Sequence, residues 1–207
     1  MGSEMCIRDR HCSIGVGSNF QPLVSSDPIY CLNANLLASG SLDWNSTSRE
    51  FNITGSLTVE SGFTFSNATT GPGAIRMNGS SNTAISIAEA FPGHFFIENT
   101  GSASSNIVTL TGDSNLDGDL TIVDGVLSIQ NGRTLYVNGD IIVQSGGELS
   151  IDAGGTLIMG NGSTLTVNTG GQLRLVGTSG NKATISATGG NSWNAIINGN
   201  LNARYYT

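Results

Sequence analysis

The densest group of side chains with metal-binding chemistry lies between residues 113 and 124. Its sequence, DSNLDGDLTIVD, places oxygen-bearing side chains at the first, third, fifth, seventh, ninth and twelfth positions and glycine at the sixth. Ca²⁺ takes about six to eight oxygen ligands, and glycine at the sixth position permits the sharp turn of such a loop. The candidate calcium ligands are Asp113, Asn115, Asp117, Asp119 and Asp124.

This segment resembles the calcium loops of EF-hand proteins and, because aspartate stands at the twelfth position, those of dockerins. A helix follows the loop in those families, whereas Leu120-Thr121-Ile122 has the alternation of a strand. The favoured interpretation is therefore an acidic turn between strands, with a calcium site as the alternative. Calorimetric titration with millimolar Ca²⁺ tests the alternative, because absence of binding excludes it.

The other acidic residues are scattered along the chain. Asp119 and Asp140 both follow glycine, 21 residues apart, so we expect them to stack at one edge. No histidine, tyrosine or lysine stands beside them, so solvated turn acids are favoured over a catalytic pair. His94 also lacks an accompanying base, and no catalytic or cofactor-binding residue is predicted. After residue 40, the acids outside 113–124 are Asp43, Glu50, Glu60, Glu89, Glu98, Asp140, Glu148 and Asp152.

The three cysteines are Cys6, Cys12 and Cys31. An odd number without a framework spacing favours unpaired thiols near the beginning of the chain. A Cys12–Cys31 disulfide is the alternative for an exported protein, because disulfides persist in oxidising compartments.

Short apolar–x–apolar triplets recur along the chain and would position all of these side chains. Alternation places the two outer residues of a triplet on one face and the middle residue on the other. Gly- and Asn-containing turns separate the triplets and permit sharp corners. The most regular triplets are Leu120–Ile122, Leu127–Ile129, Leu135–Val137, Ile141–Val143, Leu149–Ile151, Leu157–Met159, Leu165–Val167 and Leu173–Leu175.

Three triplets per turn predict an all-β fold, a three-sided parallel β-solenoid (parallel β-helix) with about 21–24 residues per coil. Inward residues of successive coils then stack into one continuous core. The outward residues form columns, of which Tyr136 over Ile158 is a small apolar strip suited to docking a glycan or a neighbouring domain. The other columns are Thr121, Ile142 and Thr166, and Ser128, Ser150 and Arg174.

The repeat divides the chain into three segments. Residues 1–10 resemble translated adapter sequence and are interpreted as an artefact or leader. Residues 11–39 are predicted to be irregular. The solenoid is expected over residues 40–207, regular at 118–176 and truncated at the C-terminus.

Composition excludes several classes of protein. Charged residues make up 11% of the chain and the net charge is −7, which excludes a helical bundle and a basic nucleic-acid-binding surface. No apolar stretch approaches the roughly 20 residues of a membrane-spanning helix. Nucleic acid is therefore not expected as a partner, and no membrane span is expected.

Two stretches carry a family resemblance: GDLTIVDGVLSIQNGRTLYVNGDIIV and GGTLIMGNGSTLTVNTGGQLRL. They resemble right-handed parallel β-helix segments of large secreted or surface bacterial proteins, such as adhesins and autotransporter passengers. The resemblance implies an extracellular or cell-surface location in a bacterium. The expected function is a structural or adhesive segment without catalysis, with surface glycans or other protein domains as partners. The alternative is the scaffold of a polysaccharide lyase or glycoside hydrolase whose active site lies outside this chain.

Overall fold

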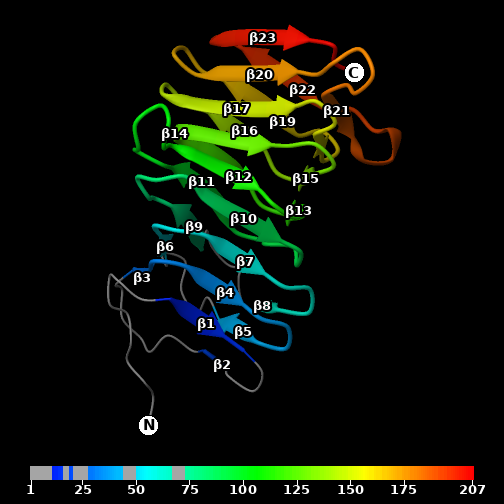
Figure 1. Cartoon of the computed structure of the whole chain (residues 1–207). Coiled ribbons are helices and arrows are strands. Elements are labelled where there is room, and N and C mark those ends of the chain that lie inside the picture. Colours follow the sequence, from blue (N-terminus) through cyan, green and yellow to red (C-terminus); the bar gives the residue numbers. More distant parts are fainter. Residues whose placement is uncertain (1–10, 16–18, 21–27, 44–49, 67–72) are drawn as a thin grey trace.

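The computed structural model describes residues 11–15, 19–20, 28–43, 50–66 and 73–207. It shows strands stacked in parallel, coil upon coil, from β1 near one end to β23 at the other (Figure 1). The predicted all-β parallel β-solenoid is therefore confirmed. Apart from strands, the described residues contain a single turn of 3₁₀ helix, Thr188–Gly190.

The strands lie on three faces. Face 1 consists of β1 (Cys12–Ile14), β4 (Ala34–Leu36), β7 (Leu57–Val59), β10 (Thr83–Ile87), β12 (Ile107–Leu110), the second half of β14 (Leu120–Ile129), β17 (Gly147–Asp152), β20 (Gln172–Val176) and β23 (Asn200–Arg204). Face 2 consists of β3 (Ile29–Cys31), β6 (Glu50–Ile53), β9 (Ala74–Met77), β11 (His94–Glu98), the first half of β14, β16 (Ile141–Val143), β19 (Thr164–Val167) and β22 (Asn194–Ile197). Face 3 consists of β2 (Asn19–Phe20), β5 (Ser41–Asp43), β8 (Thr64–Ser66), β13 (Ser114–Leu116), β15 (Thr134–Val137), β18 (Thr156–Met159) and β21 (Thr184–Ala187).

The register of the regular region is the predicted one. Leu120 pairs with Ile141, 21 residues later, and Ile141 pairs with Leu165, another 24 residues later. The three outward columns are also confirmed, because Thr121 pairs with Ile142, Ser128 with Ser150, and Tyr136 with Ile158. Each strand is too short to be stable alone and is held by its neighbours in the adjacent coils.

Two predicted triplets are joined into one strand. Leu120–Ile122 and Leu127–Ile129 belong to the ten-residue strand β14, which passes from face 2 to face 1. Its corner is Asp124-Gly125, where Gly125 has φ +82 and the Asp124 carboxylate accepts a hydrogen bond from the Gly125 N–H at 2.8 Å. The glycine lets the chain turn at this corner, where the pairing with β11 shifts its register by one residue.

The ladder of face 1 also begins earlier than the predicted boundary at residue 40. β1 pairs with β4, and β4 pairs with β7, so described residues within 11–39 already belong to solenoid coils. Cys12–Ile14 and Ala34–Leu36 are too short and too widely separated for the pattern to be evident in the sequence alone. Residues 1–10 lie outside the described residues.

The core is a continuous row of inward aliphatic side chains, extended by aromatic rings in the earlier coils. Phe65 and Phe91 lie edge to face with ring centroids 5.1 Å apart, and Phe65 makes the same kind of contact with Phe63 at 5.0 Å. Phe91 is fully buried beside Phe95, at 6.3 Å. Such pairs stabilise the core beyond the apolar area that they bury.

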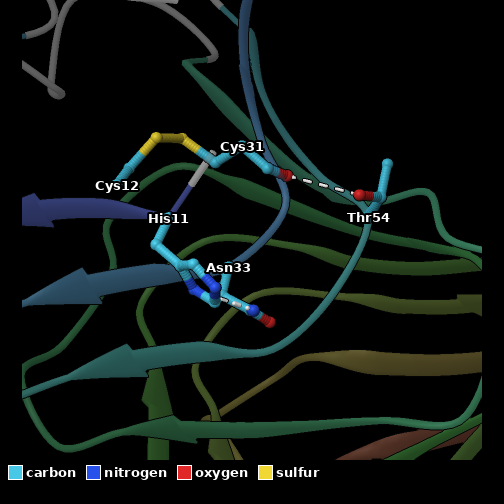
Figure 2. The surroundings of a disulfide bond; sticks show 5 residues. All are labelled: His11, Cys12, Cys31, Asn33 and Thr54. Carbon is cyan, nitrogen blue, oxygen red and sulfur yellow. Dashed lines mark hydrogen bonds between the residues drawn. A yellow bond between two sulfur atoms is a disulfide. The ribbon is translucent and has the colours of Figure 1, made fainter. Parts of the chain in front are cut away.

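Cys12 and Cys31 form a disulfide, so the expectation of unpaired thiols is wrong. Cys12 begins β1 and Cys31 ends β3, and their Cα atoms lie 5.8 Å apart, within the usual range for a disulfide. Figure 2 shows the bond beside the carbonyl of Cys31, which accepts a hydrogen bond from the Thr54 hydroxyl. The solenoid turn brings the two cysteines together, which their spacing in the sequence does not reveal.

The corner between faces 3 and 2 is built on stacked glycines. A Cβ atom at Gly118 would overlap the carbonyl oxygen of Gly93 in the preceding coil. Gly93 is equally close to the carbonyl of Gly73, and Gly139 to the backbone of Gly118. Only glycine allows the backbones of successive coils to approach this closely.

Candidate functional site

The segment predicted to bind calcium runs across two faces of the solenoid. Asp113 follows face 1, Asn115 lies within β13 on face 3, and Asp117 and Asp119 stand at the corner before β14. Asp124 lies at the next corner, after the buried stretch that begins at Leu120. The four aspartates are therefore distributed over three corners, and Asn115 lies on a strand between two of them, rather than all five being gathered in one loop.

The aspartates of this segment bind backbone and side-chain N–H groups instead. Asp113 accepts a hydrogen bond from the Thr134 N–H at 2.9 Å, in the following coil. Asp117 accepts one from the Asn138 side chain at 2.6 Å. These contacts tie each coil to the next.

The described residues contain no group of three or more histidine, cysteine, aspartate or glutamate side chains placed to hold a metal ion. The Asn115 side chain donates a hydrogen bond to the Ala88 carbonyl at 3.2 Å. Calcium binding at 113–124 stays a prediction, which the titration described above tests.

The expected stacking of Asp119 and Asp140 is confirmed. The Asp119 carboxylate accepts a hydrogen bond from the Asp140 N–H at 2.8 Å, and the Asp140 carboxylate accepts one from the Thr164 N–H at 2.8 Å. Each carboxylate thus has a donor in the coil that follows it, and the two form a ladder along one edge.

A different set of side chains surrounds an open groove on the outer surface of face 1. The groove has a volume of about 370 Å³ and lies over β12, β14, β17 and β20. Ile107 and Val126 provide half-buried apolar contacts, and the remaining lining residues are polar or charged. They are Asn82, Thr109, Ser128, Gln130, Glu148, Ser150, Asp152 and Arg174.

An ion pair holds one end of this groove. The Arg174 guanidinium binds the Asp152 carboxylate and also donates a hydrogen bond to the Ser150 hydroxyl at 2.8 Å. Ser128 donates a weaker hydrogen bond to Asp152 at 3.4 Å. The two charges lie on adjacent coils, because β17 pairs with β20 in the register Ser150 to Arg174.

Glu148 lies on the same outward side of β17 as Ser150 and Asp152. Partial burial raises the pKa of the Glu148 carboxyl, and the nearby Asp152 acts in the same direction, while Arg174 opposes the shift. Among the described residues, none makes a hydrogen bond to the Glu148 carboxylate. The groove therefore contains one carboxylate that is satisfied by the protein and one that is available to a ligand.

The sequence interpretation placed Ser128, Ser150 and Arg174 in one column but treated Glu148 and Asp152 as scattered acids. The missed signal is the spacing Glu148-x-Ser150-x-Asp152, which puts three polar residues on one side of a strand. With Arg174 already assigned to the neighbouring coil, this alternation places an arginine beside two carboxylates.

A second charged cluster lies on face 2. Arg76 binds Glu50 at 2.9 Å and also pairs with Glu98, and its guanidinium lies 3.8 Å from the centroid of the Phe96 ring. His94 stacks on Phe96 and lies within hydrogen-bond distance of the Thr121 hydroxyl, at 2.9 Å. The charged groups of this cluster are matched by partners within it, which is typical of a structural network.

Burial lowers the pKa of His94, and Arg76 acts in the same direction, while Asp119 opposes it. The imidazole is therefore neutral at neutral pH. Its ring stacks on Phe96 and bonds to the Thr121 hydroxyl.

Two other surfaces present fewer charged and polar groups that could bind a ligand. Tyr136 is 38% exposed and stacks over the half-buried Ile158, as predicted. A second groove of about 390 Å³ lies beside Leu32, Thr54, Asn78 and Thr100, and no ionisable side chain lines it. The groove on face 1 is the better candidate site, because it combines apolar contacts with hydroxyl, amide and charged groups.

None of the helical structure in the described residues is long and apolar enough to cross a membrane. The chain matches no protein-family model, no curated protein and no solved structure.

Proposed function

We propose that this chain is a structural and adhesive β-solenoid segment of an exported bacterial cell-surface protein, and that the groove on face 1 binds a surface glycan. The observation that carries the proposal is the lining of this groove. Ile107 and Val126 offer apolar contact to the C–H surface of a sugar, and Thr109 and Gln130 offer a hydroxyl and an amide group. A glycan needs this combination, because its surface alternates between C–H groups and hydroxyls.

Two further features support export and a structural role. The Cys12–Cys31 disulfide is typical of proteins that reside in oxidising compartments. The repeated coils provide a rigid frame on which one outer face keeps a fixed arrangement of side chains.

Polysaccharide cleavage is the second candidate function. It is favoured by Glu148 and Asp152 on one coil with Arg174 on the next, all in the same groove. Glycoside hydrolysis commonly uses two carboxyl groups that flank the scissile bond. This candidate differs from the alternative drawn from the sequence, because its residues lie within the chain.

One experiment separates the two candidates. The purified chain is tested on immobilised bacterial and plant polysaccharides, and the soluble fraction is assayed for new reducing ends. We expect retention of the protein without release of sugar. Release of reducing ends that Glu148→Gln abolishes would establish the enzymatic function instead. Failure to bind any polysaccharide would contradict the glycan-binding proposal.

A further inference from the structure

We infer that the groove on face 1 selects glycans that carry free amino groups, with the Glu148 carboxylate as the group that receives the ammonium. This inference rests on the proposed glycan-binding function and names the chemical class of the ligand. It follows from which charges of the groove are already matched and which one is not.

Arg174 is occupied by the protein itself. Its guanidinium binds the Asp152 carboxylate and the Ser150 hydroxyl, and both the Arg174 and Asp152 side chains are only 35% exposed. An anionic ligand that bound Arg174 would lie next to the Asp152 carboxylate, whose negative charge repels it. The only arginine of the groove lining is therefore poorly suited to binding uronate, sulfate or phosphate groups.

Glu148, in contrast to Arg174, has a side chain without a hydrogen-bond partner among the described residues. Its side chain is half-buried in the groove, and no described residue donates a hydrogen bond to its carboxylate. A partly desolvated carboxylate without a donor is unfavourable, and a ligand that donates hydrogen bonds relieves this cost. An ammonium offers three donors and a full opposite charge, and hydroxyl groups offer only the donors.

The net charge of the groove also favours a cationic ligand. The groove lining contains two carboxylates, Glu148 and Asp152, and one guanidinium, Arg174, which leaves one net negative charge. The whole chain carries −7. A cationic glycan is therefore attracted both at short range and during its approach, and a polyanionic one is repelled.

The two serines of the groove strengthen the contrast between Asp152, which has partners in the protein, and Glu148, whose carboxylate accepts no hydrogen bond from the described part of the chain. Ser128 and Ser150 are buried, and both hydroxyls lie within reach of Asp152. They hold the Asp152–Arg174 pair in place, and Glu148 is the groove carboxylate to which no described residue donates a hydrogen bond. We therefore expect the ammonium of the ligand at Glu148 and the remaining sugar hydroxyls at Thr109 and Gln130.

The test compares soluble oligosaccharides of glucosamine, N-acetylglucosamine and galacturonate by isothermal titration calorimetry with the full chain. Measurement at about pH 6 keeps the amino groups protonated. We expect the glucosamine oligomer to bind about tenfold to hundredfold more tightly than its N-acetylated counterpart, the range of a hydrogen bond to a charged group. The galacturonate oligomer should bind weakest.

Glu148→Gln keeps the shape of the side chain and removes the charge, and it should abolish the preference for glucosamine. Glu60→Gln is the matched control, because Glu60 lies outside the groove and the amide oxygen of glutamine can still accept the hydrogen bond that Glu60 receives from the Ala38 N–H. The control should keep the preference. A circular dichroism spectrum of each variant verifies the fold.

Equal binding of all three oligomers, or tighter binding of galacturonate, would overturn the inference and leave glycan binding itself intact. A preference for glucosamine that persists in Glu148→Gln would also overturn it. Absence of binding by every oligomer would overturn both the inference and the proposed function.

Discussion

His94 lies in a cluster in which one arginine, Arg76, pairs with two glutamates, Glu50 and Glu98. It stacks on Phe96 at a centroid distance of 4.1 Å, and its Nε2 atom is 2.9 Å from the Thr121 hydroxyl. Arg76 lies over the same ring, between carboxylates on both neighbouring coils. Protonation of His94 would add a cation next to Arg76 in a partly desolvated place.

The His94 environment predicts a pH dependence of stability. Because folding lowers the pKa of His94 from about 6.5, the unfolded chain binds more protons once the pH falls below that value. The contribution of neutral His94 to the free energy of unfolding should therefore be fully present above pH ~6.5. It should decrease as the pH falls toward the folded-state pKa. Urea denaturation at several pH values measures this decrease.

His94→Gln is the informative variant, because glutamine can still bond to the Thr121 hydroxyl but does not titrate. It should flatten the stability profile between neutral and mildly acidic pH. An unchanged slope in His94→Gln would assign the pH dependence to other groups.

Residue roles were predictable where register alone decides them. The stacking of Asp119 and Asp140 followed from equivalent positions 21 residues apart, and the structure confirms it. Glu148 and Asp152 gain their importance only when their strand lies beside the one that carries Arg174, and the pairing of β17 with β20 determines this.

At the scale of elements, the corners determine how closely coils can stack. Gly118 stands over Gly93, and a Cβ atom there would overlap a backbone carbonyl that has no side-chain freedom to move away. The two coils would have to separate locally, which weakens the strands on both sides of the corner.

Gly118→Ala should therefore destabilise the protein by about 1–3 kcal/mol, the usual range for an overpacked position. Gly180→Ala is the control, because nothing lies within 4 Å of a Cβ at Gly180 and its φ is not in the left-handed region. Thermal unfolding followed by circular dichroism compares the two variants. Equal melting temperatures would show that the corner accommodates the added methyl group without loss of stability.

The elements themselves were predictable where the repeat is regular. The triplets from Leu120 to Leu175 fall on strands because each has two inward aliphatic residues and a turn on either side. The coils before residue 40 were not predicted, because Cys12–Ile14 and Ala34–Leu36 are recognisable as solenoid strands only from the pairing of β4 with β1 and β7. Long-range pairing of this kind leaves little trace in a local pattern.

At the scale of the whole molecule, the disulfide anchors one end of the stack. Cys12 and Cys31 are 19 residues apart in the sequence and join β1 of face 1 to β3 of face 2. Closing a loop of this size removes conformational freedom from the unfolded chain, and the effect is typically about 2–4 kcal/mol.

Reduction should therefore lower the stability of the coils at the β1 end by about that amount and leave those at the β23 end almost unchanged, because each coil contacts only its neighbours. Hydrogen exchange with and without reductant measures both ends in one experiment. A Cys6→Ser background removes the third thiol and prevents exchange of disulfides. Uniform loss of protection along the chain would instead indicate a single cooperative unit.

The continuous register has a mechanical consequence. Coils are spaced by the distance between paired strands, about 4.8 Å, yet each coil of the regular region contains 21–24 residues. Under tension a single coil that peels from the end would shorten the stack by one strand spacing and release roughly 70–80 Å of extended chain. Such a rod would resist small loads as a stiff stalk and yield to large ones in steps of nearly equal length. Single-molecule stretching would record these steps, and one abrupt extension of the full length would rule them out.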